Sequence, residues 1–257
     1  MNIAVCAKEV VDVSEIKIDE KTNKPILEGI SKEVNDIEKS AVEEAIKIKE
    51  EYGGEITILT VGSVDNMENM KELLAMGADE AVIISPPEES DYTVVSELLA
   101  GAVEEIGDID LVLCGEASID LFSGQVGPRI AELLNVPQIT YAENLDVEEE
   151  KIVGERDVGG NKIMTVESPY PVVVTVTKEI NDPRLPSLQE ILGAANKPIN
   201  EWGPKEFMDH EIEPTTEMKD IRGVSMERKN IIFDEDELED SVKNLAENIA
   251  KEGLLEG

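Results

Sequence analysis

The feature that most constrains the fold is a regular alternation of short apolar runs and longer amphipathic segments in the first 141 residues. The apolar runs are rich in β-branched residues and occupy positions 3–7, 55–61, 81–84 and 109–114, with another beginning at 138. Apolar residues recur every three or four positions, as on one face of a helix, in the segments 34–51, 66–76, 92–106 and 126–134. This alternation predicts right-handed βαβ units and a mostly parallel, doubly wound α/β sheet covered on both faces.

The pattern changes after residue 141. Residues 144–156 and 161–167 predict a β-meander, and residues 171–177 predict a further buried strand. Three prolines then fall between positions 183 and 198, which favours an exposed loop with a short helix. We expect all of these elements to belong to one α/β domain at residues 1–200.

Residues 201–257 are predicted to form an extended arm that ends in a helix. Residues 203–227 are polar with weak periodicity, and residues 229–233 favour a strand. Residues 236–251 carry an apolar stripe at helical spacing. We expect the apolar side chains of this stripe to be buried by packing against either the main domain or a partner protein.

Composition argues against several classes of function. The sequence holds 58 acidic and 23 basic residues, a formal net charge of −35, so DNA, RNA and anionic membranes would be repelled. Aromatic residues make up only 3%, too few for stacking on single-stranded nucleic acid. Two cysteines and one histidine cannot build a Cys/His zinc site, and no run approaches the roughly 18 apolar residues of a membrane span. We expect a cytoplasmic protein whose acidity either keeps it soluble or reflects a salty or warm habitat.

Three segments of unusual chemistry leave the carboxyl ends of predicted strands, where open parallel sheets bind ligands. They are residues 5–8, 59–62 and 114–126, and the third is far longer than the roughly two to six residues that a strand-to-helix connection needs. Gly124 and Gln125 directly precede a helix, whose free N–H groups and positive dipole end favour an anion. The sequence has neither a Walker motif nor a G-x-G-x-x-G fingerprint, so this loop is either a different nucleotide site or an elaborate surface loop.

Five motifs in chain order carry a resemblance to a known family. They are V-C-A-K-E-V-V-D, N-D-I-E-K-S-A-V-E-E-A, L-A-M-G-A-D-E-A, C-G-E-A-S-I-D-L-F-S-G-Q-V-G-P-R-I-A-E-L-L and N-D-P-R-L-P-S-L. Together they resemble the β subunit of electron-transfer flavoproteins from residue 1 to about residue 202, and more weakly to the end. The Q-V-G-P and L-G-A-A-N-K-P-I tracts are more similar to the Fix-type branch, which includes electron-bifurcating members, than to the classical branch.

The resemblance implies an adenine-nucleotide-binding α/β domain, similar to that of universal stress proteins, in a heterodimer whose larger α subunit holds the redox FAD. The heterodimer would carry electrons from an acyl-CoA or other dehydrogenase to a quinone or ferredoxin-type acceptor. This chain would bind AMP, as classical members do, or a second FAD, as bifurcating members do. It would be an electron-carrier subunit rather than an enzyme, with its C-terminal helix packed on the α subunit.

Carried over residue by residue, the resemblance implies a nucleotide site built from four segments, with the phosphates at Gln125, Val126 and Gly127. The expected site residues are Cys6, Ala7, Lys8, Asn35, Asp36, Ile37, Glu38, Val61, Gly62, Glu116, Ala117, Ser118, Asp120, Ser123, Gly124, Gln125, Val126, Gly127 and Ala131. Asn35-Asp36-Ile37 departs from the N-P-F of the classical family, and Asn35 is equally consistent with a simple helix N-cap.

The family's partner recognition loop corresponds to residues 181–197, with Leu185 as the docking side chain just before a proline. The alternative is that Leu185 fills a groove of its own domain. The sequence offers no triad or carboxylate pair for acid–base catalysis, so the redox chemistry would belong to the flavin. A rival interpretation is a nucleotide-binding regulator of the universal-stress-protein type, which would not need residues 181–257; a hydrolase is a weaker one.

Overall fold

The computed structural model describes residues 1–63, 67–160, 162–223, 230–235 and 237–253. The chain forms two compact units, Met1–Ile221 and Arg222–Gly257. The first unit therefore includes residues 201–221, which the sequence pattern predicts to be part of the arm. In the described part of the chain, no helix is long and apolar enough to cross a membrane.

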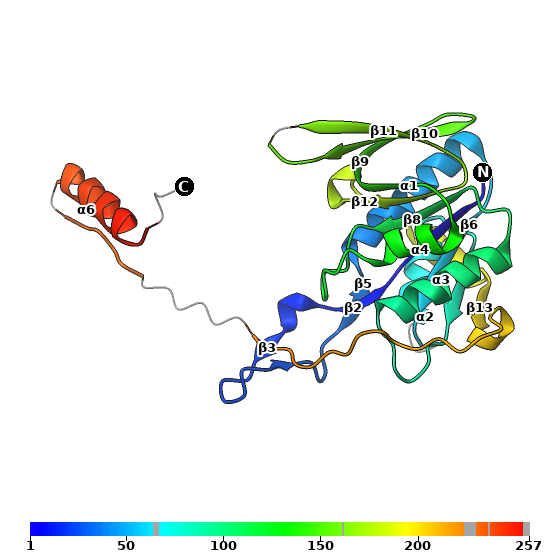
Figure 1. Ribbon diagram of the computed structural model, residues 1–257, viewed down its shortest axis with the longest axis horizontal. Coiled ribbons are helices and arrows are strands. Elements are labelled where there is room, and N and C mark those ends of the chain that lie inside the picture. Colours follow the sequence, from blue (N-terminus) through cyan, green and yellow to red (C-terminus); the bar gives the residue numbers. More distant parts are fainter. Residues whose placement is uncertain (64–66, 161, 224–229, 236, 254–257) are drawn as a thin grey trace. The chain divides into compact units, whose positions relative to one another are not determined.

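The first unit is built on a nine-stranded sheet (Figure 1). In spatial order the strands are β11 (Ile163–Pro169), β10 (Lys151–Asp157), β9 (Gln138–Val147), β12 (Val172–Val176), β8 (Leu111–Gly115), β1 (Ile3–Cys6), β6 (Ile56–Val61), β7 (Glu80–Ile84) and β13 (Ile199–Trp202). Neighbours from β9 to β13 pair in parallel, whereas β10 pairs antiparallel with both β9 and β11. The predicted parallel sheet and the predicted meander are thus parts of one continuous sheet.

Helices cover both faces of this sheet. They are α1 (Asp36–Tyr52), α2 (Met67–Met76), α3 (Tyr92–Ile106), α4 (Val126–Leu134) and α5 (Leu188–Ala194). Two small antiparallel ribbons, β2 (Glu9–Val11) with β5 (Lys32–Val34) and β3 (Lys17–Ile18) with β4 (Pro25–Ile26), lie between β1 and α1 in the sequence. Short 3-10 turns occupy η1 (Val13–Glu15), η3 (Lys178–Ile180) and η4 (Pro204–Glu206).

Strand β1 shows how the sheet separates two hydrophobic cores. Ile3 and Val5 belong to the core that contains the apolar side chains of α1 and α2, whereas Ala4 and Cys6 belong to the core with those of α3 and α4. All four side chains are buried, as the period of two along a strand with both faces covered requires. The predicted doubly wound α/β class is confirmed.

Residues 203–221 follow β13 and pack on the α3 side of the sheet. Phe207 and Met208 join the core around α3, and a Cβ at Gly101 of that helix would lie 2.9 Å from the Phe207 ring. This close approach explains why the first unit continues beyond the predicted boundary at residue 200.

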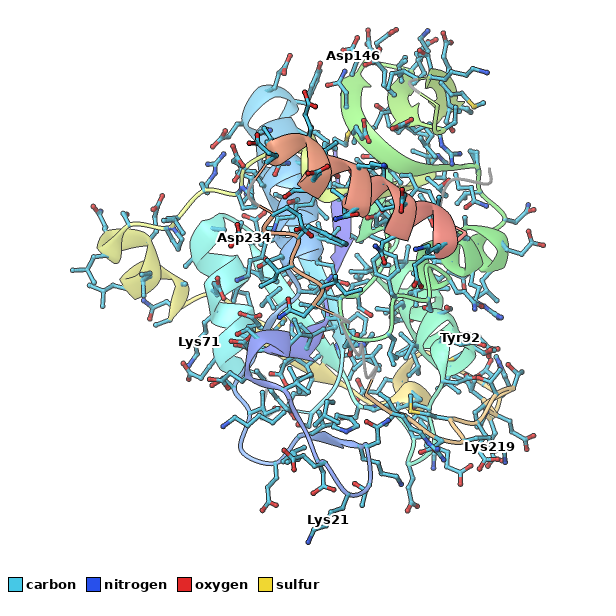
Figure 2. All side chains as sticks on the ribbon, turned by 90° about the vertical axis from the view of Figure 1, so that its left-hand side faces the viewer. Lys21, Lys71, Tyr92, Asp146, Lys219 and Asp234 are labelled. Carbon is cyan, nitrogen blue, oxygen red and sulfur yellow. The ribbon has the colours of Figure 1, made fainter. Side chains whose placement is uncertain are left out.

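The second unit contains α6 (Leu238–Lys251), which confirms the predicted C-terminal helix. The expected strand at 229–233 does not form in its described part, since residues 230–233 have no regular structure. In Figure 2, oxygen-tipped side chains project from the ribbon on every side of the view, in keeping with the net charge of −35.

Candidate functional site

A cavity of about 580 Å³ opens at the carboxyl ends of β1, β6 and β8. Its floor contains Cys6 and Cys114, which face each other in the register of the parallel β1–β8 pair, and Val61 at the end of β6. Both cysteines are free and buried. A hydrogen bond with Cys114, together with burial, raises the pKa of the Cys6 thiol well above its ordinary value, so this thiol of the floor is neutral.

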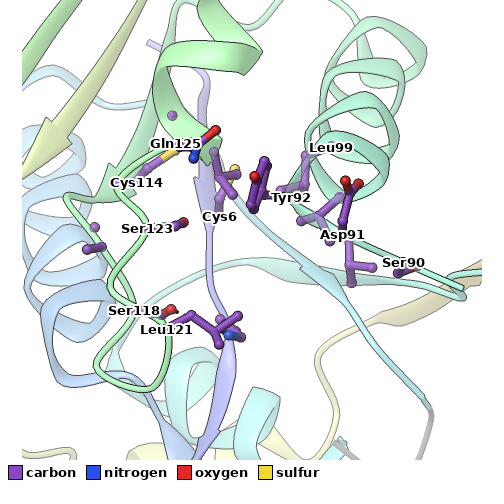
Figure 3. A pocket seen from close by; sticks show the side chains of 18 of the residues that line it. Cys6, Ser90, Asp91, Tyr92, Leu99, Cys114, Ser118, Leu121, Ser123 and Gln125 are labelled. Carbon is purple, nitrogen blue, oxygen red and sulfur yellow. Dashed lines mark hydrogen bonds between the residues drawn. The ribbon is translucent and has the colours of Figure 1, made fainter. Parts of the chain in front are cut away.

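The long loop after β8 and the first turn of α4 form one side of the cavity, where Figure 3 shows Ser118, Ser123 and Gln125. Gln125 at the N-cap position of α4 makes no side-chain capping hydrogen bond, so it does not occupy the first N–H groups of the helix, which a ligand could use. Gly124 adopts φ +62°, a conformation that disfavours a side chain. Gly127 has a different reason to be glycine, since a Cβ there would lie 2.4 Å from Thr175 of β12.

Asn35 fixes this loop from the start of α1. Its side-chain amide donates to the Ala117 carbonyl at 3.2 Å and accepts from the Ile119 N–H at 3.1 Å. Asn35 occupies the N-cap position of α1, but its side chain makes no capping hydrogen bond. The residue is fully buried, so these two bonds have no competition from water. Asn35 therefore supports the cavity loop rather than acting as a simple cap.

Lys8, Asp120 and Glu38 meet next to the loop. The Lys8 ammonium lies 2.7 Å from an Asp120 carboxylate oxygen and 3.4 Å from the Ser118 hydroxyl, while the Lys8 N–H donates to the Glu38 carboxylate. Burial raises the pKa of Glu38 to about 8, against the smaller opposing effect of the bond from Lys8. Burial, followed by the charges of Glu179 and Glu143, also raises the pKa of Glu116. Glu38 in the cavity wall thus repels an anion less than a fully charged carboxylate would.

The opposite side of the cavity comes from residues that the sequence pattern did not predict. Figure 3 shows Ser90, Asp91, Tyr92 and Leu99 across from the α4 loop. Further lining residues outside the prediction are Val95, Thr216, Glu217 and Met218, whereas Cys114, Gly115 and Leu121 lie in the predicted segment 114–126. For Asp91 and Tyr92 the available signal is the start of the predicted helix 92–106, because helix N-termini at this edge of a parallel sheet face its ligand crevice.

A second exposed feature is the segment 181–197, between η3 and β13. Leu185 is 94% exposed, so the alternative in which it fills a groove of its own domain is wrong. Leu188, Ile191 and Leu192 on α5 are also exposed, so four large apolar side chains of this segment are open to solvent.

The backbone beside Leu185 is held firmly on α1. The Arg184 guanidinium contacts both carboxylate oxygens of the buried Glu43 at 2.9 and 3.0 Å, and it reaches Glu50 at 2.6 Å. The Arg184 N–H also donates to Glu43 at 3.1 Å, and the Asn181 amide donates to the Ser40 carbonyl at 3.0 Å. At the far end Ser187 and Glu190 form a capping box for α5. The apolar Leu185 is thus presented on a fixed backbone.

Comparison with known proteins bears on both features. A family model described as electron transfer flavoprotein domain matches residues 26–206. The chain belongs to the electron transfer flavoprotein family.

Relatives of this flavoprotein chain share well over half of its length. It is 40% identical over 200 residues to the electron transfer flavoprotein subunit beta of Thermoanaerobacterium thermosaccharolyticum, covering 77% of this chain and 76% of that protein. It is 38% identical over 211 residues, 80% of each chain, to the caffeyl-CoA reductase-Etf complex subunit CarD of Acetobacterium woodii. It is also 38% identical over 204 residues, 78% of each chain, to the subunit beta of Bacillus subtilis. The resemblance to electron-transfer flavoprotein β subunits is confirmed, and the stress-protein alternative is not favoured.

The structure brings most of the expected nucleotide-site residues of this flavoprotein chain to one cavity. Those that line it are Cys6, Ala7, Lys8, Glu38, Val61, Glu116, Ala117, Ser118, Ser123, Gly124, Gln125, Val126 and Gly127. The other expected residues do not line it. Asn35 and Asp120 bond to residues that line the cavity, and Ile37 packs on one of them, Gly115. Asp36 forms an ion pair with Lys178 at 3.3 Å. The Gly62 N–H bonds to the end of β7, and Ala131 is buried in the core between the sheet, α3 and α4.

Proposed function

We propose that this chain is the β subunit of a heterodimeric electron carrier and that its cavity holds an adenine nucleotide. The observation that carries the proposal is the cavity itself, where the start of α4, small residues and the buried Glu38, whose pKa burial raises to about 8, meet in one place. Its volume of about 580 Å³ lies within the range of roughly 300–1,000 Å³ typical of ligand sites.

The residues present fit such a ligand. Phosphate groups would lie at Gln125–Gly127, where backbone N–H groups and the helix dipole favour negative charge. The uncharged part of the nucleotide would lie on the apolar floor and against Tyr92, Val95 and Leu99 of α3. Leu121 and Met218, which line the cavity while more than half exposed, are available to cover it.

In the proposed heterodimer the redox FAD, held mainly by the α subunit, supplies the electron transfer chemistry. This chain's residues bind and orient: those of the cavity hold AMP or a second FAD, and Leu185 on its fixed backbone docks the electron donor or acceptor. The apolar stripe of α6, where Leu238 and Val242 are exposed, would pack on the α subunit.

The test is to purify the full chain alone and co-expressed with its α subunit, release bound nucleotides with acid, and identify them by chromatography. We expect about one AMP or FAD per chain from this subunit, and the two outcomes decide between a classical and a Fix-type site. A chain that is folded and nucleotide-free in both preparations would contradict the proposal. A chain ending at Ile221 should keep its nucleotide but pull down less α subunit.

A further inference from the structure

One wall of the cavity comes from outside the α/β alternation. Thr216, Glu217 and Met218 belong to the arm that follows β13, more than 80 residues beyond the α4 loop, yet they line the same cavity. The sequence resemblance weakens beyond residue 202, so these residues are not among those expected at the site.

Asp91 connects this wall to α3 through both of its carboxylate oxygens. One oxygen caps α3 by accepting from the N–H groups of Thr93 at 2.9 Å and Val94 at 3.0 Å. The other accepts from the N–H and hydroxyl groups of both Thr215 and Thr216 at 2.8 to 3.2 Å. The Thr93 and Thr215 hydroxyls lie 2.6 Å apart and add a further hydrogen bond.

The charge state of Asp91 matches this arrangement. Desolvation would raise its pKa, but the hydrogen bonds from Val94, Thr216 and Thr215 outweigh desolvation and hold the pKa well below its usual range. The carboxylate therefore stays charged through the neutral and mildly acidic range, and hydrogen bonds to a charged acceptor are the stronger kind.

The rest of the arm is attached differently. Upstream, Phe207 and Met208 are packed into the α3 core, and the His210 ring lies 3.6 Å from the Glu97 carboxylate. Around the cavity, Met218 is 63% exposed, so apolar packing does little to hold this end. Polar bonds from Thr215 and Thr216 to Asp91 and Thr93 fasten the segment to α3 instead.

We infer that Thr215–Met218 is a closing wall of the ligand site and that Asp91 is the positioning residue that holds it there, so that a bound nucleotide leaves only after this contact opens. The inference rests on the proposed nucleotide site and extends that site from the α/β domain to the arm. It assigns to Asp91 a role in ligand retention in addition to its role as a helix cap.

Two substitutions separate the roles of Asp91. Asn and Ser are about as good at an N-cap as Asp, so Asp91→Asn and Asp91→Ser keep α3 capped. If the Asn side chain keeps its oxygen on α3, its NH2 group faces the four donors of Thr215 and Thr216 and cannot accept from them. A Ser side chain caps α3 with its hydroxyl and has no second oxygen to accept from the arm. From the other side, Thr215→Val combined with Thr216→Val removes the two hydroxyl donors. Asp12→Asn is the matched control, since Asp12 caps η1 and does not line the cavity.

The measurements are the dissociation rates of radiolabelled AMP and of FAD from the full chain, and the rate at which a maleimide labels Cys6 and Cys114 on the cavity floor. We expect the Asp91 variants to release the bound nucleotide at least about tenfold faster than wild type, with a smaller change in association rate and little change in melting temperature. Adding the threonine substitutions to Asp91→Asn should have little further effect, because both remove the same contact.

The thiol measurement needs no ligand, and it separates failure of this inference from failure of the nucleotide proposal. If wild type binds AMP or FAD and the Asp91 variants release it at the wild-type rate, the inference is overturned while the proposed function stands. If wild type binds neither nucleotide, the proposed function fails. In that case faster maleimide labelling in the Asp91 variants still supports a closing wall, whereas unchanged labelling overturns the closing-wall inference.

Discussion

Two loops leave neighbouring strands at the same edge of the sheet and serve opposite purposes. The loop after β8, residues 116–125, encloses a cavity, whereas the segment 181–197 after β12 presents Leu185 to solvent. Both are anchored on α1: Asn35 at its start holds the first loop, and Glu43 and Glu50 further along hold the second. One helix thus supports both the surface proposed to bind a ligand and the surface proposed to dock a partner, and substitutions should affect them separately.

The largest effect is expected at the cavity. Gly124→Glu places a side chain at φ +62° and a negative charge where phosphate oxygens are proposed, so we expect loss of the bound nucleotide without global unfolding. Nucleotide content after acid release and the melting temperature are the measurements. Gly159→Glu is the control, since Gly159 has φ +82° but a Cβ there would meet nothing within 4 Å. Full nucleotide content in Gly124→Glu would place the site elsewhere.

The next effect concerns the partner-facing loop. Leu185→Ala removes an exposed apolar side chain that would fill a partner pocket, and such an anchor contributes on the order of 2 kcal/mol, roughly thirtyfold in affinity. We expect slower reduction by the cognate dehydrogenase at subsaturating concentration, at low and high salt alike, because salt screens charges and not apolar contacts. Ile163→Ala, at the exposed edge strand β11, is the control. Wild-type rates would mean that Leu185 has no part in docking.

A crossed pair of substitutions tests whether α1 supports the two loops independently. Asn35→Ala leaves the Ala117 carbonyl and the Ile119 N–H without their partner, so nucleotide affinity should fall about tenfold while docking is kept. Arg184→Lys keeps a positive charge next to Glu43 but loses the two simultaneous contacts with its carboxylate oxygens. Electron transfer with the partner should therefore slow several-fold while the bound nucleotide is kept. If either variant impaired both measurements equally, the two loops would be one coupled unit.

The smallest effect is a pH dependence. Burial raises the pKa of Glu38 from 4.5 to about 8, so between these values the folded chain holds a proton that the unfolded chain has released. The free energy of unfolding should therefore fall as pH rises from about 4.5 to about 8. Glu38→Gln, which stays neutral, should flatten this slope in denaturant titrations, whereas Glu88→Gln on the exposed surface should not. A wild-type slope in Glu38→Gln would show that Glu38 is charged in the folded state at neutral pH.

The alternation of the first 141 residues was sufficient to predict the doubly wound sheet, because strands buried on both faces must be continuously apolar. The α4 side of the cavity could be predicted from the same pattern, because it directly follows one predicted strand and begins one predicted helix. The contact between α3 and the arm could not be predicted, because Asp91 and Thr215 lie 124 positions apart and nothing local in either segment indicates that they meet. Likewise β13 depends on pairing with β7, and the short apolar run at 231–233 pairs with no strand in the described part of the chain.

The position of β13 has a consequence for the length of the chain before it. Val176 ends β12 in the middle of the sheet and Ile199 begins β13 at its edge, with β8, β1, β6 and β7 between them. At about 4.8 Å per strand, the connection must span about 24 Å across the helices of one face. An insertion in residues 181–197 would lengthen this connection without moving β12 or β13. An extended chain spans about 3.3 Å per residue, so fewer than about eight residues could not bridge this distance. Only a deletion that removed most of residues 177–198 would therefore draw β13, and with it the arm that follows, off the edge of the sheet.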